Sequence, residues 1–387
     1  MTGLSKSTIS ELVSSSLDLK LNNLLEKLRN KAVESNSETD FRTMVLFGNE
    51  LKRVSRLDDA KAIYEDLLRE NIEDNDKRIT LLNNYGALLH DMGCYEKALE
   101  KYGASLKLSE SLFGQDHPSY ATTLNNMATV YRALGDLNSS LELYKRSLRL
   151  SELLSGPDDP SVAISYNNIA SNLDAQGRYS EAESLFRKSL EISERVLGKD
   201  HASTATNYNN IASNLIAQGR YAEAEPLFKK GLEIIERVLG QNHPSTAASY
   251  NNIASNYAAQ GRYYEAEPLY RRALDIRERV LGIDHPSTAA SYNNIASNLD
   301  AQGRIKEAEP LYRRALDIRE RVLGENHPDT ANSYNNVAAN LNAQGRYDEA
   351  ELLYKKAIAI SERVLGPHHP NSLVLSGNYR ANKRMAQ

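Results

Sequence analysis

The chain has little of what a disulfide framework, a nucleic-acid surface or a membrane span requires. Its single cysteine, Cys94, cannot pair within the chain, and its net charge of −4 with a pI of about 6.1 gives no basic excess. No run of about 18 apolar residues occurs that could cross a bilayer. We therefore expect no nucleic-acid partner, no membrane span and a reducing, cytoplasmic setting.

Motifs for catalysis and cofactor binding are also missing. The sequence has no phosphate-binding G-x-x-x-x-G-K, no dinucleotide fingerprint and no nucleophile elbow, so we expect no enzymatic activity and no cofactor. Several His-Pro pairs invite a metal site, but metal ligands must converge within about 2.0–2.2 Å of one ion. Histidines a full repeat apart are better explained as turn or helix-start residues. They are His117, His243, His285, His327 and His369.

What the sequence does contain is a stretch that returns every 42 residues. Asn-Asn pairs fall at 83/84, 125/126, 167/168, 209/210, 251/252, 293/294 and 335/336. Glycines keep the same step at Gly93, Gly135, Gly177, Gly219, Gly261, Gly303 and Gly345. A fixed period of this size is typical of stacked-repeat proteins, in which each repeat contacts only its neighbours.

The unit at 244–282 indicates how each repeat folds. Pro244 can open a helix, because its missing N–H costs nothing in the first turn, and Gly261 can end it. One face of this helix carries Tyr250, Ile253, Ala254 and Tyr257. A second helix, ending at Gly282, is expected to turn inward Tyr263, Ala266, Leu269, Tyr270, Ala273, Leu274, Val280 and Leu281. The pattern predicts an all-α, right-handed α-solenoid of eight antiparallel helix pairs, with an extra helix at each end.

The positions of the repeats divide the chain into four segments. Residues 1–40 are expected to form a helix and linker that cap the array or, alternatively, carry a docking surface. Residues 41–78 form a degenerate first repeat, and residues 79–372 form seven full repeats. Residues 373–387 are predicted to be a C-terminal capping helix, whose Asn378-Tyr379 does not coincide with the positions of the earlier pairs.

The unit resembles the tetratricopeptide repeat. The matching positions are Tyr250, Ile253, Ala254, Tyr257, Gly261, Tyr263, Ala266, Tyr270 and Ala273. That family's ordinary repeat has about 34 residues. The stretched length, the Asn-Asn pair and the segments 265–270, 272–274, 280–282 and 284–286 resemble the repeats of kinesin light chains. The resemblance covers about residues 79–372 and implies a helical scaffold with a concave groove for an extended peptide or a partner domain.

The second asparagine of each pair is predicted to point away from the core face of its helix. An amide offers two donors and an acceptor, so a row of them could hold a peptide backbone. In tetratricopeptide domains that clamp peptides this asparagine often has that role. The alternative is that the amides bond each other or a neighbouring helix and fix the stacking. The candidate residues are Asn84, Asn126, Asn168, Asn210, Asn252, Asn294 and Asn336.

Arg132 is a further candidate. It resembles an arginine that faces the cargo groove in kinesin light chains, and it would favour an acidic peptide at one end of the groove. The alternative is a lone surface charge.

The leading functional hypothesis is a non-enzymatic scaffold for protein partners. The alternatives are a regulatory sensor arm of a signalling complex and a cargo adaptor like a kinesin light chain. The sequence does not indicate an oligomeric state.

Overall fold

The computed structural model describes residues 38–69 and 74–385, which contain seventeen α-helices and no strand. The helices are α3 (Glu38–Arg53), α4 (Leu57–Arg69), α5 (Asn75–Asp91), α6 (Tyr95–Phe113), α7 (Pro118–Ala133), α8 (Leu137–Ser155), α9 (Pro160–Ala175), α10 (Tyr179–Val196), α11 (Ala202–Ala217), α12 (Tyr221–Leu239), α13 (Pro244–Ala259), α14 (Tyr263–Leu281), α15 (Pro286–Ala301), α16 (Ile305–Leu323), α17 (Pro328–Ala343), α18 (Tyr347–Leu365) and α19 (Pro370–Met385). The helix predicted within residues 1–40 lies mostly outside the described residues. None of the described helices is long and apolar enough to cross a membrane.

The starts and ends of the helices follow the repeated residues. His243 caps α13, where its Nδ1 accepts a hydrogen bond from the backbone N–H of Ser245 at 3.1 Å, and Pro244 begins the first turn. The turn after this helix contains Gly261 with φ of 75°, a left-handed conformation that favours glycine. Equivalent histidines cap α11, α15 and α17 in the same way. The expected helix-start role of the histidines is therefore confirmed.

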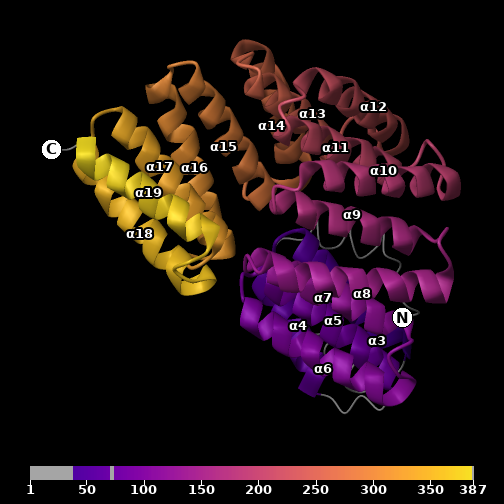
Figure 1. The fold of residues 1–387 in the computed structure, drawn as a ribbon. Helices are drawn as coiled ribbons and strands as arrows, with labels where there is room; N and C mark the ends of the chain where they lie inside the picture. Colours follow the sequence, from indigo (N-terminus) through magenta and orange to yellow (C-terminus); the bar gives the residue numbers. More distant parts are fainter. Residues whose placement is uncertain (1–37, 70–73, 386–387) are drawn as a thin grey trace. The chain divides into compact units, whose positions relative to one another are not determined.

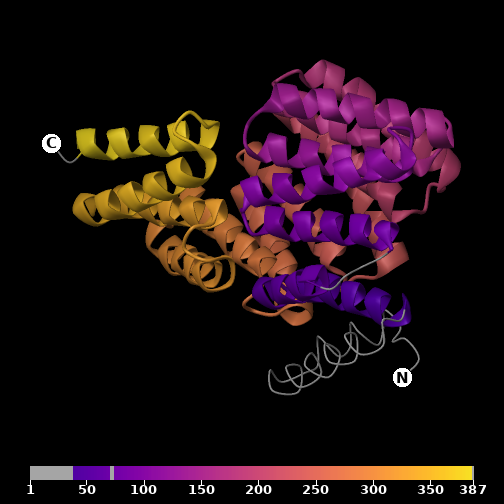
Figure 2. The same cartoon turned by 90° about the horizontal axis from the view of Figure 1, so that it is seen from below.

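The chain forms two compact units, Met1–Val130 and Tyr131–Gln387. In unit 1, α4 packs against α3 and α5, and α5 packs against α6. In unit 2, each second helix from α10 to α18 packs against the first helix of its own repeat and the first helix that follows, as α14 does with α13 and α15 (Figure 1). Figure 2 shows α19 alongside α18 at the C-terminal end of this unit. The predicted all-helical stack of helix pairs is confirmed.

Small residues allow the two helices of a repeat to approach closely. Ala254 on α13 and Ala266 on α14 have no exposed surface, and both belong to a core cluster with Ile295 and Tyr312 of the following repeat. The predicted inward position of Val280 is wrong, because its side chain is 45% exposed. The second helix has 19 residues and the first has 16, so the last turn of the second helix extends beyond its partner.

Candidate partner-binding face

The paired asparagines form a row of hydrogen bonds between successive first helices. Asn210 Nδ2 donates to Asn167 Oδ1 at 2.7 Å, and Asn294 Nδ2 donates to Asn251 Oδ1 at 2.6 Å. The same contact joins Asn336 to Asn293 at 2.7 Å, Asn378 to Asn335 at 2.9 Å and, in unit 1, Asn126 to Asn83 at 3.4 Å. We call this row the asparagine ladder. Its bonds are those that the stacking alternative requires.

The C-terminal helix continues the ladder, which corrects the register expected there. Asn378 lies one step of 42 residues after Asn336, so it occupies the position of a second asparagine. Its partner in the first position is replaced by Gly377. Gly377 interrupts the Asn-Asn motif, so the positions of the pair in this helix are 377/378 and not 378/379.

Asn294 shows that a ladder amide can keep part of its hydrogen-bonding capacity. All seven predicted second asparagines are half-buried, at Asn84 on α5, Asn126 on α7, Asn168 on α9, Asn210 on α11, Asn252 on α13, Asn294 on α15 and Asn336 on α17. The bond from Asn294 uses one hydrogen of Nδ2, and among the described residues its second hydrogen and its Oδ1 have no partner. The stacking contact and a contact to a partner are therefore compatible.

The ladder is interrupted at Asn209. Its Oδ1 is buried and has no hydrogen-bond partner among the described residues. This oxygen lies 2.6 Å from where a Cβ on Gly231 would be placed, whereas the equivalent position of the next repeat is Ala273. The absence of a side chain at Gly231 thus gives Asn209 a position that the other first asparagines do not have.

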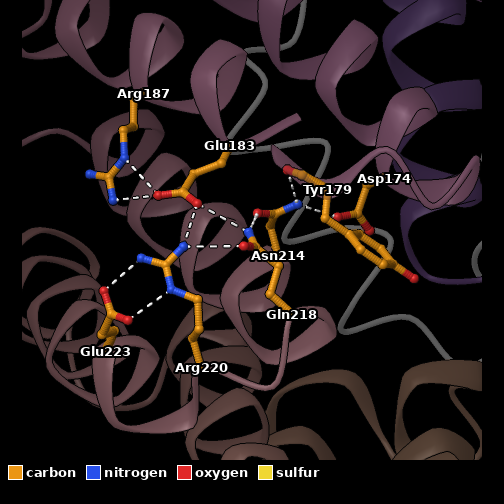
Figure 3. Close-up of polar contacts among 8 residues, drawn as sticks. All are labelled: Asp174, Tyr179, Glu183, Arg187, Asn214, Gln218, Arg220 and Glu223. Carbon is orange, nitrogen blue, oxygen red and sulfur yellow. Dashed lines mark hydrogen bonds and ion pairs between the residues drawn. The ribbon is translucent and has the colours of Figure 1, made fainter. Parts of the chain in front are cut away.

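A third asparagine, present in each first helix from α9 to α19, was not recognised from the sequence. Asn214 is 1% exposed, and its Nδ2 donates to Asp174 Oδ1 at 2.6 Å and to the carbonyl of Tyr179 at 3.1 Å. Gln218 Nε2 donates to Asn214 Oδ1 at 2.7 Å (Figure 3). The available signal was the return of Asn every 42 residues from position 172 to position 382. These asparagines join the first helix of one repeat to the second helix of the repeat before it.

Charged residues extend this junction toward the second helices. Glu183 accepts hydrogen bonds from Gln218 at 3.0 Å, from Arg220 at 2.7 Å and from Arg187 at 2.7 Å (Figure 3). Burial would raise the pKa of Glu183, but these three donors outweigh it and hold the pKa below its ordinary value. Glu267 and Glu309 make the same contacts in later repeats.

The junctions differ in whether the buried asparagine is fully bonded. Asn340 has the same set of partners as Asn214, with Asp300 Oδ1 at 2.8 Å in the place of Asp174. Where the equivalent residue is Ile216 or Ala258, the following asparagine bonds only a backbone carbonyl. Asn256 Oδ1 and Asn298 Oδ1 are then buried without a partner among the described residues. An unsatisfied buried acceptor costs about 1–3 kcal/mol, so these junctions are expected to be the weaker ones.

Arg132 lies at a hollow on the surface formed by the first helices. The cavity has a volume of about 290 Å³ and is lined by Arg132, Ser171, Asp174, Asn210, Ser213 and Asn214. Arg132 is exposed, and within the described part of the chain it forms no ion pair. The hollow thus brings Arg132 together with one of the predicted asparagines, Asn210. The other predicted asparagines do not line it.

Comparison with known proteins agrees with this architecture. The model of the tetratricopeptide repeat family matches residues 77–152, 123–195, 161–237, 203–263, 245–321, 301–363 and 329–379. No curated protein matches the chain.

Three solved structures are similar. A candidate kinesin light chain of Podosopora anserina with nearly identical TPR-like repeats is 27% identical, with a TM-score of 0.44 over 53% of this chain and 97% of that one. BtubC (BKLC) of P. vanneervenii is 22% identical, with a TM-score of 0.46 over 61% and 92%. A Rap protein complexed with competence and sporulation factor is 15% identical, with a TM-score of 0.61 over 93% and 97%. Because the family model covers most of its length, the chain belongs to the tetratricopeptide repeat family.

Proposed function

We propose that the protein is a non-enzymatic scaffold that binds an extended peptide of a partner protein on its first-helix face. This face is the surface carried by α9, α11, α13, α15 and α17, and it includes Asn168, Asn210, Asn252, Asn294 and Asn336. The observation that carries the proposal is the spare capacity of the asparagine ladder. An amide that already holds its neighbour in place can present its remaining groups to a peptide backbone without reorganising.

The energetics are sufficient for a transient complex. Each hydrogen bond between an amide and a peptide group contributes a net of about 0.5–1.5 kcal/mol. Four or five such bonds, together with the burial of a few side chains, are enough for affinity on the order of micromolar. Arg132 adds a preference for an acidic residue near the α9 end of the face. The Rap structure supports the proposal only in that a chain of this fold can hold a partner factor.

The test is a triple variant in which Asn210, Asn252 and Asn294 are changed to Ala. Peptides are selected from a random library by binding to the wild-type chain, and their affinities for both proteins are measured by calorimetry. Weaker binding by the folded variant supports the proposal, whether or not its melting temperature falls. The bonds from Asn210 and Asn294 to the preceding repeat will also be lost, so the affinity is compared at a temperature where both proteins are fully folded.

Normal affinity in a folded variant with a lower melting temperature would contradict the proposal. The ladder would then serve only the stacking of the repeats. Asn378→Ala is the matched control, because it removes the same kind of ladder bond, to Asn335, from α19, which is not part of the proposed face; its affinity for the peptides should equal that of the wild type.

A further inference from the structure

The first-helix face has a second cavity, separate from the hollow at Arg132. It has a volume of about 150 Å³ and lies between the first halves of α9 and α11, with α10 behind it. Its walls include Ala163, Ile164 and Leu197, and Ile164 is 57% exposed although it is a large apolar residue. Exposed apolar side chains beside a cavity are a feature of binding sites.

The polar groups at the base of this cavity already bond each other. Asn207 Nδ2 donates to Ser193 Oγ at 2.8 Å and to the carbonyl of Ser189 at 3.2 Å. Ser189 Oγ lies 2.7 Å from the carbonyl of Ala163 and donates to it. All three polar residues are at most 5% exposed. An apolar group can therefore enter without leaving a buried donor unpaired, and a charged group would find no partner there.

In the next three repeats the position of Ser193 is filled by a larger side chain of the chain itself, whereas the last repeat has Ser361. Ser193 corresponds to Ile235, Arg277 and Arg319. Ile235 is 3% exposed. Arg277 donates to Ser291 Oγ at 2.7 Å, and Arg319 donates to Ser333 Oγ at 2.7 Å, so each extends from its second helix to the next first helix. Burial lowers the pKa of both guanidinium groups, in agreement with their enclosed position.

We infer that the cavity between α9, α10 and α11 is an anchor pocket for one aliphatic side chain, leucine, isoleucine or methionine, of the bound peptide. The inference rests on the proposed function for the peptide itself. An apolar cavity of about 150 Å³ accommodates a benzene molecule, so a branched aliphatic side chain fits and an indole ring does not. Asn167 lines the cavity and accepts the ladder bond from Asn210, so an anchored side chain places its backbone beside the ladder.

The pocket can be tested with N-acetyl-leucinamide, without a natural partner. The probe is titrated into the full chain labelled at the isoleucine δ-methyl groups, and the Ile164 signal is assigned by its loss in Ile164→Val. We expect a saturable shift of the Ile164 methyl, with dissociation in the millimolar range. N-acetyl-glycinamide and N-acetyl-tryptophanamide are the controls and should give less than a tenth of this shift at equal concentration.

The repeats provide a matched closing variant. Ser193→Arg combined with Asn207→Ser copies the Arg277 and Ser291 pair of α14 and α15 and should abolish the response. Ser193→Ile, which copies Ile235, is the second variant in case the first does not fold, and unchanged signals of Ile253 and Ile295 report folding. A response that persists in a folded closing variant, an equal response to the glycine probe, or no response overturns the inference. If Ile164 responds but the ladder variant binds its peptides normally, the pocket is retained and the ladder proposal is lost.

Discussion

First and second helices hold the same repeats together by different chemistry. The first helix α13 contains no Asp, Glu, Lys or Arg, whereas α14 contains Glu265, Arg271, Asp275 and Arg279 among others. Neighbouring first helices are joined by amides, as between Asn294 and Asn251. The second helices meet the adjacent repeats through ion pairs, as between Arg304 and Glu267 at 2.9 Å. A polar face with few charges can give up its water to a peptide at lower cost than a highly charged one, which favours the first helices as the proposed binding side.

The contact between the two kinds of helix should be the most sensitive to change. Ala266 is fully buried where α14 meets the first helices, and nothing larger fits without moving a helix. We expect Ala266→Leu to lower the free energy of unfolding by about 1–3 kcal/mol. Urea denaturation followed by circular dichroism measures this, with Ala259→Leu at an exposed position as the control. Equal midpoints for both variants and the wild type would show that the helices are not closely packed there.

Removing the buried asparagine should have unequal effects at different junctions. Asn214→Ala leaves Asp174, the Tyr179 carbonyl and Gln218 without their partner, and we expect a loss of about 2 kcal/mol. Asn256→Ala removes one hydrogen bond of 3.4 Å and an oxygen that has no partner in the described residues, so its loss should be under about 1 kcal/mol. Urea midpoints of the two variants give the comparison. Equal losses would mean that the bonds of Asn214 add nothing to the junction.

The ion pairs of the second helices should be weaker and sensitive to salt. Arg304 bonds Glu267 of the preceding second helix and Glu307 of its own helix, and its side chain is 34% exposed. We expect Arg304→Ala to lower the free energy of unfolding less than Asn214→Ala does at low ionic strength, and to lower it still less in 1 M sodium chloride. The cost of Asn214→Ala should change little with salt. A salt-independent cost for Arg304→Ala would indicate lost packing of its stem instead.

The smallest expected effect is the contribution of Asp300 to the pH dependence of the free energy of unfolding. Burial raises the pKa of this carboxyl above its ordinary 3.8. The folded protein therefore binds the proton more tightly than the unfolded chain, so this contribution to stability is present below pH 3.8 and is lost as the pH rises through the raised pKa. Asp300→Asn keeps an acceptor for Asn340 and removes the titration. Wild type should gain stability relative to this variant on going from pH 7 to pH 4, and a constant difference would contradict the assignment.

The sequence predicted the parts of the fold that depend on spacing within one repeat. The 42-residue period, the glycine ends, the histidine starts and the buried Ala254 and Ala266 were all accessible in this way. The partners of the buried asparagines could not be predicted in this way. Asn214 bonds atoms that are 35 and 40 residues away in the chain, and their position depends on how the repeats stack. The anchor cavity depends on Ser193 being smaller than its counterparts in the next three repeats, which matters only once the neighbouring helices are placed. The role of the ladder in binding stays a prediction.

The most direct test of the account is a hydrogen–deuterium exchange footprint of a bound peptide. The full chain is saturated with a peptide selected from the random library, and backbone exchange is followed by mass spectrometry. We predict slower exchange in α9, α11 and α13 on binding, with little change in the outward-facing last turns of α10, α12 and α14. Protection confined to the second helices, at saturating peptide, would contradict the proposal that the first-helix face is the binding surface.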